Sequence, residues 1–264
     1  MSGFQNLGDE LDAWSACGLR ATLWLRDDDA CANSPALRKL LGIARDHRVP
    51  VGIAAIPAAA DATLVDAIAS CDEASVIQHG YAHRNHAAPG ARAAELGAER
   101  VLAVRVEEIA RGRTRLADLF GERFIPVLVP PWNRMAGDLV PHLVSAGFLG
   151  LSRFGPRGRA TPAPGLREIN THVDVIAWRR ERAFIGAHAA IERLVTHLRA
   201  RRERRCDADE PTGLLTHHLV FDDAAWAFLD ALFRLLREHD AVSWLDVTRA
   251  FEAPDIALTS ARSA

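Results

Sequence analysis

The stretch RATLWLRDDDACANSP, residues 20–35, predicts the fold of the whole chain. Its apolar run from Arg20 to Leu25 is typical of a buried strand, and three consecutive aspartates follow that run directly. Ser34 and Pro35 then supply an N-cap and a first-turn proline for a helix. A buried strand, a polar strand end and a helix make one βα unit, which predicts an α/β fold if the pattern repeats.

The pattern does repeat along the chain. The predicted strands are residues 20–25, 51–56, 75–78, 126–129, 148–152, 166–170, 213–216 and 242–245. The predicted helices are residues 35–44, 61–70, 93–120, 137–146, 186–205 and 222–239. Strands that are nearly all followed by a helix imply parallel pairing. We find no linker or compositional break, and we expect residues 1–264 to form one domain.

Composition and charge exclude several classes of protein. The 264 residues include 32 basic and 34 acidic side chains, a formal net charge of −2, so no overall charge attracts nucleic acid or an anionic membrane. No apolar run approaches the roughly 20 residues of a membrane span. The first residues lack the charged and apolar regions of a signal peptide, so we expect a bacterial cytoplasmic protein. The four scattered cysteines predict neither a disulfide framework nor a cysteine zinc site.

Polar residues from five distant parts of the chain all follow predicted strands. They are Asp27 to Asp29, His79 to His86, Pro130 to Asn133, Asp174 to Trp178, and His217 with His218. In a (β/α) barrel the carboxyl ends of the strands share one face, and that face carries the active site. This placement favours a barrel over an open sheet and predicts one shared site.

The spacing of His79 and His83 is that of metal ligands. Four residues apart, they share one face if the segment turns helically after the strand. Two imidazoles and a carboxylate leave coordination positions open, which suits zinc or another first-row divalent ion acting as a Lewis acid. The alternative is a pair of solvated loop histidines, because so short a motif is weak alone. Three adjacent carboxylates repel one another, and a metal would compensate them while leaving one as a general base.

These motifs resemble, in content and order, those of the NodB-type polysaccharide deacetylases, carbohydrate esterase family 4. The matching segments are RDDDA (26–30), HGYAHRNH (79–86), PPWN (130–133), Asp174 with Trp178, and LLTHH (214–218). The resemblance spans roughly residues 20–220 and is strongest to a divergent branch of small bacterial proteins. It implies a distorted (β/α)7 TIM-like barrel that hydrolyses N-acetyl or O-acetyl groups on sugars with one divalent metal ion, zinc being the first expectation.

The resemblance also implies roles for the aspartates and the histidine pair. Asp28 matches the catalytic base, and Asp29, His79 and His83 match the metal ligands. A rival register, with Asp27 as the base and Asp28 as the ligand, stays open.

The later motifs are matched in the same way. Trp132 supplies a backbone N–H for the oxyanion, and a donor fixed by two prolines needs no reorganisation. His217 would protonate the leaving amine, with His218 as the alternative, and adjacent strand residues point to opposite sides. The substrate-binding or supporting residues are expected to be Asp27, Pro131, Asn133, Asp174 and His218.

The chain departs from the family pattern at several positions. Gly80 stands where the family has Ser or Thr, and the arginine that precedes the prolines in the family is absent, with Arg134 as the nearby substitute. Trp178 is expected to be an ordinary core residue. Two other functions therefore stay open: a metal-dependent hydrolase of another amide or ester, and a weakened barrel that binds a sugar or metal without turnover.

Overall fold

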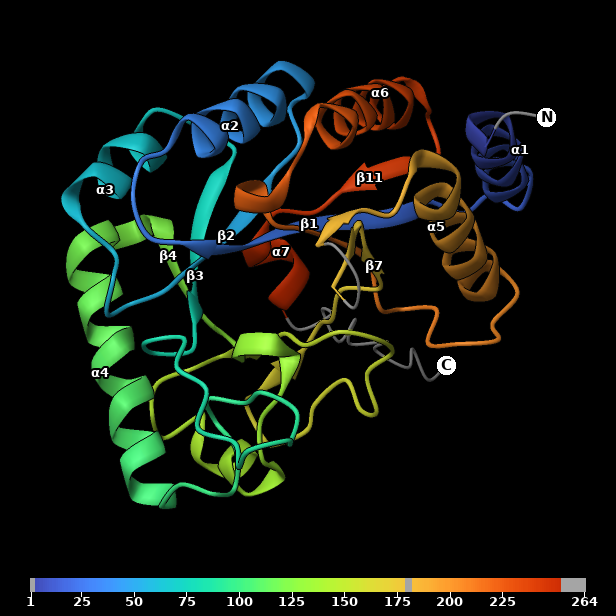
Figure 1. Cartoon of the computed structure of the whole chain (residues 1–264). Helices are drawn as coiled ribbons and strands as arrows, with labels where there is room; N and C mark the ends of the chain where they lie inside the picture. Colours follow the sequence, from blue (N-terminus) through green and yellow to red (C-terminus); the bar gives the residue numbers. More distant parts are fainter. Residues whose placement is uncertain (1–2, 179–181, 253–264) are drawn as a thin grey trace, which may run out of the picture.

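Strand β1 (Ala21–Ala30) lies near the middle of the sheet in the computed structural model, which describes residues 3–178 and 182–252 (Figure 1). The strand order is β6-β5-β4-β3-β2-β1-β10-β7, and every pair along this path is parallel. The other strands of the path are β2 (Val51–Ala55), β3 (Ala74–His79), β4 (Phe124–Val129), β5 (Gly150–Leu151), β6 (Arg167–Glu168), β7 (Val173–Asp174) and β10 (Thr212–Thr216). The strands curl into a distorted, partly open barrel, which confirms the predicted fold class.

Helices cover the outside of the curled sheet (Figure 1). They are α1 (Gly3–Ala16), α2 (Pro35–His47), α3 (Ala62–Ala69), α4 (Leu102–Phe120), α5 (Ala187–Arg202) and α6 (Asp223–Glu238). Ser34 caps α2 as predicted, because its hydroxyl accepts the backbone N–H of Leu37 at 3.0 Å. Helix α1 packs on α5 and was not predicted. No helix among the described residues has both the length and the apolar character to cross a bilayer.

The last described elements pack against the middle of the molecule. Strand β11 (Val242–Trp244) pairs with the first residues of β1, and helix α7 (Val247–Phe251) follows it. Val247 and Phe251 belong to a buried cluster with Trp24 of β1 and Val127 of β4. Phe251 meets Trp24 edge-on, with ring centroids 5.8 Å apart. Helix α7 therefore fills the inside of the curl, where its ribbon lies in Figure 1.

Three local expectations are wrong. The aspartates lie within β1, because the strand continues to Ala30 instead of ending at Leu25. Residues 137–142 form a 3-10 helix with Pro141 inside it, and no α-helix spans 137–146. The helix predicted over 93–120 begins only at Leu102. A short hairpin of β8 (Ile176–Ala177) and β9 (Ala183–Phe184) carried too little pattern to be predicted.

Side chains hold the seam between β6 and β7, the two ends of the strand order in the described part of the chain. The carboxylate of Glu210 is buried and accepts the backbone N–H groups of Asn170 at 2.9 Å and Arg157 at 3.2 Å. The Trp24 indole N–H donates to the Asn170 carbonyl at 3.0 Å. These bonds satisfy backbone groups for which a barrel strand would otherwise have supplied partners.

Gly213 of β10 allows the close approach at this seam, and we expect Gly213→Ala to be destabilising. An added Cβ would lie 2.5 Å from the Asn170 carbonyl oxygen and 2.6 Å from Thr171 Cα, both backbone atoms. Overpacking of this kind typically costs about 1–3 kcal/mol, which urea unfolding would measure. Gly8→Ala in α1 is the control, because nothing lies within 4 Å of its added Cβ. That variant should gain about 0.5–1 kcal/mol, and equal stability of the two would contradict the seam argument.

Candidate active site

Three predicted metal ligands converge at the carboxyl ends of β1 and β3. The ligand atoms of Asp29, His79 and His83 all lie within 4.8 Å of one another. The Asp29 Oδ1 atom is 3.2 Å from His79 Nε2 and 3.3 Å from His83 Nε2. The three residues come from the end of β1, the end of β3 and the loop after β3. The spacing places the two histidines on one face only if this loop turns helically; it does not, because Gly80 and His83 both have left-handed backbones, yet both rings reach Asp29.

The chemistry of these atoms fits a divalent cation. The Nδ1 atom of His79 lies 3.1 Å from the Val129 carbonyl, so in the neutral ring Nδ1 carries the proton and Nε2 presents a lone pair. The Asp29 Oδ1 atom is buried and has no hydrogen-bond partner among the described residues. Lone pairs that face one another across a buried gap need a shared positive partner. Asp29, His79 and His83 would supply a His2Asp set for one ion.

The electrostatics of the ligands are consistent with this interpretation. Burial raises the pKa of the Asp29 carboxyl, but His79, His217 and His83 together hold that pKa well below its ordinary value. Burial and the neighbouring His79 lower the pKa of His83. Asp29 is therefore ionised and His83 neutral at neutral pH, the protonation states that metal ligands require. Burial lowers the pKa of His79, but Asp28 and Asp29 together raise it above its ordinary value, so a cation at this site would compete with a proton on His79.

A break in β1 brings two neighbouring aspartates to the same site. The pairing of β1 with β2 shifts register between Asp27 and Ala30, and Asp29 has φ 76°. Regular strand residues alternate between faces, so Asp28 and Asp29 would otherwise point apart. Asp27 is fully buried and faces β10, where it accepts from Thr216 Oγ1 at 2.7 Å and contacts the His218 ring. The geometry favours the register with Asp28 and Asp29 at the site.

Asp28 is held by Arg26, a residue that the sequence analysis did not select. The Arg26 Nε atom donates to Asp28 Oδ1 at 2.8 Å and its Nη2 atom donates to Asp28 Oδ2 at 3.0 Å. The remaining donors reach Asn133 Oδ1 at 2.7 Å, Ser152 Oγ at 2.8 Å and the Arg153 carbonyl at 3.2 Å. All five N–H groups of this buried guanidinium are thus used. Arg134, the substitute that the sequence suggested, donates to the Ala93 carbonyl at 2.9 Å.

The PPWN segment forms a strained turn beside the histidines. Trp132 and Asn133 have φ values of 55° and 56°, a left-handed conformation that is uncommon outside glycine. The bonds of this turn run from Asn133 N to the Pro130 carbonyl and from Arg134 N to the Pro131 carbonyl. The Trp132 N–H is not used by either bond. The ring centroids of Trp132 and His83 lie 4.3 Å apart, so this turn borders the candidate metal centre.

His217 and His218 point to different partners, as the sequence analysis predicted for adjacent residues. His217 Nε2 lies 3.9 Å from Asp28 Oδ2, whereas His218 is buried against Asp27. The Trp178 ring meets the His217 ring edge-on, with ring centroids 4.5 Å apart. The indole N–H of Trp178 donates to Asp174 Oδ2 at 2.7 Å. Trp178 is 40% exposed, so its expected place in the core is wrong. Burial raises the pKa of Asp174 above its ordinary value.

Solved structures share this architecture. A Mycobacterium smegmatis protein assigned to the polysaccharide deacetylases superposes with a TM-score of 0.62 at 17% identity, over 86% of this chain and 87% of that chain. A family 4 carbohydrate esterase from Streptomyces lividans in complex with acetate has a TM-score of 0.55 at 15% identity, over 85% and 91%. The fold is that of carbohydrate esterase family 4. No protein-family model and no curated protein matches the sequence.

One solved structure with the carbohydrate esterase fold is described as a pseudoenzyme. BA3943 from Bacillus anthracis, a family 4 pseudoenzyme, has a TM-score of 0.55 at 14% identity, over 88% of this chain and 66% of that chain. A mutant of it, with restored enzymatic activity, superposes with a TM-score of 0.58. The carbohydrate esterase fold therefore does not by itself establish turnover.

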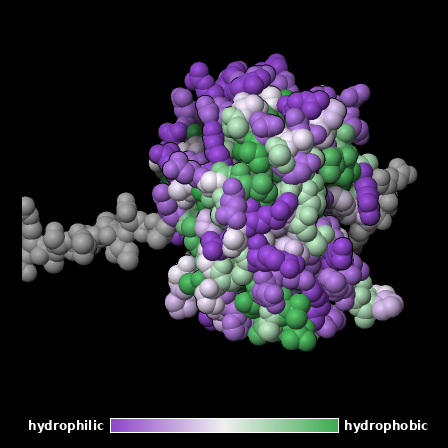
Figure 2. Space-filling view, turned by 90° about the vertical axis from the view of Figure 1, so that its left-hand side faces the viewer, coloured by the Kyte–Doolittle hydropathy of each residue, from purple (hydrophilic) through white to green (hydrophobic). Residues whose placement is uncertain are grey.

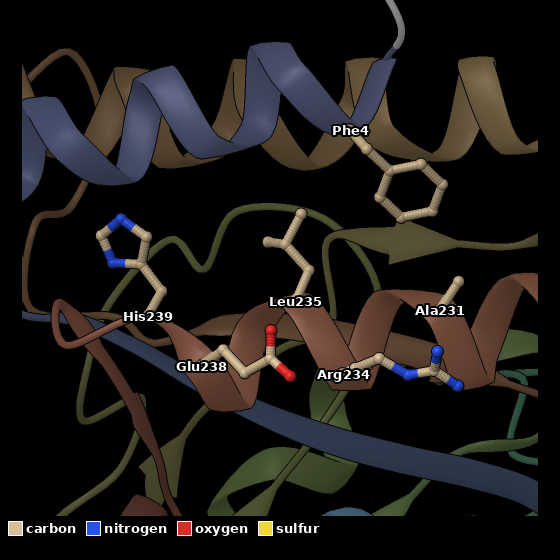
Figure 3. A pocket seen from close by; sticks show the side chains of 6 residues that line it. All are labelled: Phe4, Ala231, Arg234, Leu235, Glu238 and His239. Atoms are coloured by element: carbon tan, nitrogen blue, oxygen red, sulfur yellow. The ribbon is translucent and has the colours of Figure 1, made fainter.

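A separate hollow lies on the outside of this carbohydrate esterase fold, between α1 and α6 (Figure 3). Phe4 of α1 and Leu235 of α6 extend towards each other's helix, with Arg234, Glu238 and His239 along the rim. None of its lining residues is a predicted site residue. In Figure 2 hydrophobic residues appear as patches among hydrophilic ones.

Proposed function

We propose that this chain is a metal-dependent hydrolase that removes acetyl groups from N-acetylated or O-acetylated sugars. The observation that carries the proposal is the convergence of Asp29, His79 and His83 beside the paired Asp28 and the buried His217. This set brings together a candidate cation site, a carboxylate that Arg26 holds in one orientation, and an imidazole 3.9 Å from that carboxylate. Those are the parts that hydrolysis of an amide by an activated water requires.

A divalent ion held by Asp29, His79 and His83, zinc being our first choice, would polarise the acetyl carbonyl and favour ionisation of water. Asp28, held by Arg26, removes the proton from the attacking water. The Trp132 N–H donates to the oxyanion that forms as the new C–O bond is made. His217 gives a proton to the amine as the C–N bond breaks, which releases acetate.

The supporting residues act through these groups. Asn133 accepts from Arg26, and Pro131 fixes the turn that presents Trp132. Asp27 binds His218, which anchors the segment directly after His217. Asp174 orients Trp178 against the His217 ring. We propose an acetylated sugar as the substrate, in keeping with the near-neutral net charge of the chain.

One neighbour of the same fold favours a second candidate function, a barrel that binds a sugar or metal without turnover. BA3943 is described as a pseudoenzyme, and this chain lacks the arginine that the family carries before its prolines. Arg26 is an argument against that alternative. From β1 it makes two hydrogen bonds to the Asp28 carboxylate, and it thereby supplies a guanidinium that the segment before the prolines lacks.

The test is acetate release from N-acetylglucosamine oligomers. Protein loaded with zinc should release acetate, lose this activity after treatment with a chelator and regain it when zinc or another first-row divalent ion is restored. Tight binding of the oligomer with no acetate after long incubation would favour the binding barrel. Hydrolysis of non-sugar amides alone would identify a different amidase with the same site.

A further inference from the structure

Glu95 lies beneath the loop that carries His83. Its side chain is almost fully buried, with 1% of the residue exposed. The carboxylate accepts three backbone N–H groups, from Tyr81 at 3.0 Å, Ala82 at 2.7 Å and Arg84 at 3.4 Å. These N–H groups stand on both sides of His83 in the sequence. A buried carboxylate that gathers N–H groups in this way fixes the backbone between them.

Gly80 makes room for that carboxylate. Its φ is +55°, and an added Cβ would lie 2.0 Å from Glu95 Oε2 and 2.5 Å from Pro131 Cγ. The space that a Ser or Thr side chain would need at this position is therefore occupied by Glu95 and by the proline turn. Glu95 can therefore occupy its place only because residue 80 has no side chain.

The loop needs an anchor because it is strained. His83 has φ 54°, and a left-handed backbone at a residue other than glycine typically costs about 1–3 kcal/mol. Without a partner for its N–H groups, the loop would relax and take His83 Nε2 away from its position 3.3 Å from Asp29. His79 has no such need, because it ends β3 and its ring is held by the Val129 carbonyl.

We propose that Glu95 is the positioning residue of the candidate metal centre, fixing His83 towards Asp29 by binding the N–H groups that flank it. This inference rests on the proposed function, since it assumes that Asp29, His79 and His83 hold a divalent ion. In this chain the residue after His79 is Gly80, which has no side chain to hold the loop. The proposal assigns the positioning of His83 to a carboxylate 12 residues further along the chain.

The experiment measures zinc affinity by competition with a chelating dye, using the full chain. In Glu95→Gln an amide NH2 replaces one carboxylate oxygen and meets a backbone N–H, so the loop loses at least one bond. Loss of such an outer partner typically weakens metal binding about 10–100-fold, and we expect a loss in that range. Glu210→Gln is the matched control, because Glu210 is equally buried and accepts two backbone N–H groups at the seam. That control should bind zinc as the wild type does.

Cobalt substitution and a double variant separate positioning from general damage. The visible absorption of the Co2+ protein should change in Glu95→Gln and stay unchanged in Glu210→Gln, even if both unfold at lower temperature. Gly80→Ala should weaken zinc binding strongly in the wild type and less in a Glu95→Ala background, because the contact with Glu95 Oε2 at 2.0 Å is then gone and only the contact with Pro131 Cγ at 2.5 Å remains.

The outcomes distinguish the two proposals. Wild-type zinc affinity and an unchanged cobalt spectrum in Glu95→Gln would overturn the role of Glu95 and leave the metal centre intact. A wild-type chain that binds neither ion would overturn the proposed function, and the role of Glu95 with it. Equal losses in Glu95→Gln and Glu210→Gln would show a general effect of buried glutamates and would also overturn the inference.

Discussion

Asp28→Asn is expected to lower kcat for acetate release by about 10²–10⁴-fold, the range that a positioned general base typically contributes. The asparagine amide fits the same space but cannot take a proton from the attacking water. Zinc affinity should change little, because the ligand atoms belong to Asp29, His79 and His83. The measurements are steady-state kinetics on an N-acetylglucosamine oligomer and zinc competition on the same preparation.

Asp27→Asn is the comparison that decides between the two registers of the aspartates. Asp27 is fully buried and bonds to Thr216 and to the backbone N–H of His218. We expect this variant to be less stable, yet to retain more activity per folded molecule than Asp28→Asn. Full activity in Asp28→Asn would contradict our assignment of the base. Loss of zinc binding in Asp28→Asn would instead favour the rival register, with Asp28 as a ligand.

Arg26→Met is expected to lower the free energy of unfolding by about 3–5 kcal/mol, the usual cost of removing one partner from a buried ion pair. It leaves the Asp28 carboxylate buried without its cation and also removes the donors to Asn133 and Ser152. The rate of acetate release should fall as well, because the base is no longer held in one orientation. Urea unfolding and kinetics at a permissive temperature measure the two effects separately.

Two further variants test the cause of that loss. In Arg26→Met with Asp28→Asn no unpaired charge remains, so the double variant should be more stable than Arg26→Met alone. Arg105→Met is the matched control, because Arg105 makes a similar two-bond pair with Asp138 but that carboxylate is 48% exposed. Water can solvate Asp138 after the change, and we expect a smaller loss. A double variant no more stable than Arg26→Met would contradict the buried-pair explanation.

The sequence predicted the order of strands and helices because their signals are local. Apolar runs, the Ser34 cap and the spacing of leucines in α2 are each visible within about one element. The end of β1 was missed for a physical reason: charged residues rarely continue a buried strand, so the strand seemed to end at Leu25. Only tertiary partners make such a strand tolerable, and these lie as far away as Thr216.

The residues of the candidate site also fall into those that the sequence predicted and those that it did not. The paired histidines, the aspartates and the proline turn were visible as motifs, and the structure brings members of all three together. Arg26 stood in the RDDDA segment without an assigned role, and Glu95 lay outside every motif, since the roles of both exist only through the atoms that they contact in space. Gly80 was the one available signal for Glu95. A glycine where related sequences place a larger side chain indicates that another group occupies that volume.

The central place of β1 has a consequence for how the protein is made. A ribosome makes β1 before β10, so Asp27 can bond to Thr216 only when a partner 189 residues further along has been synthesised. Until then Asp27, which is fully buried in the folded protein, lacks the hydroxyl and backbone N–H groups that it accepts from β10 and the residues after it. Distant contacts of this kind slow folding. The pairing of β1 with β10 can therefore form only after the strands and helices between them have been synthesised.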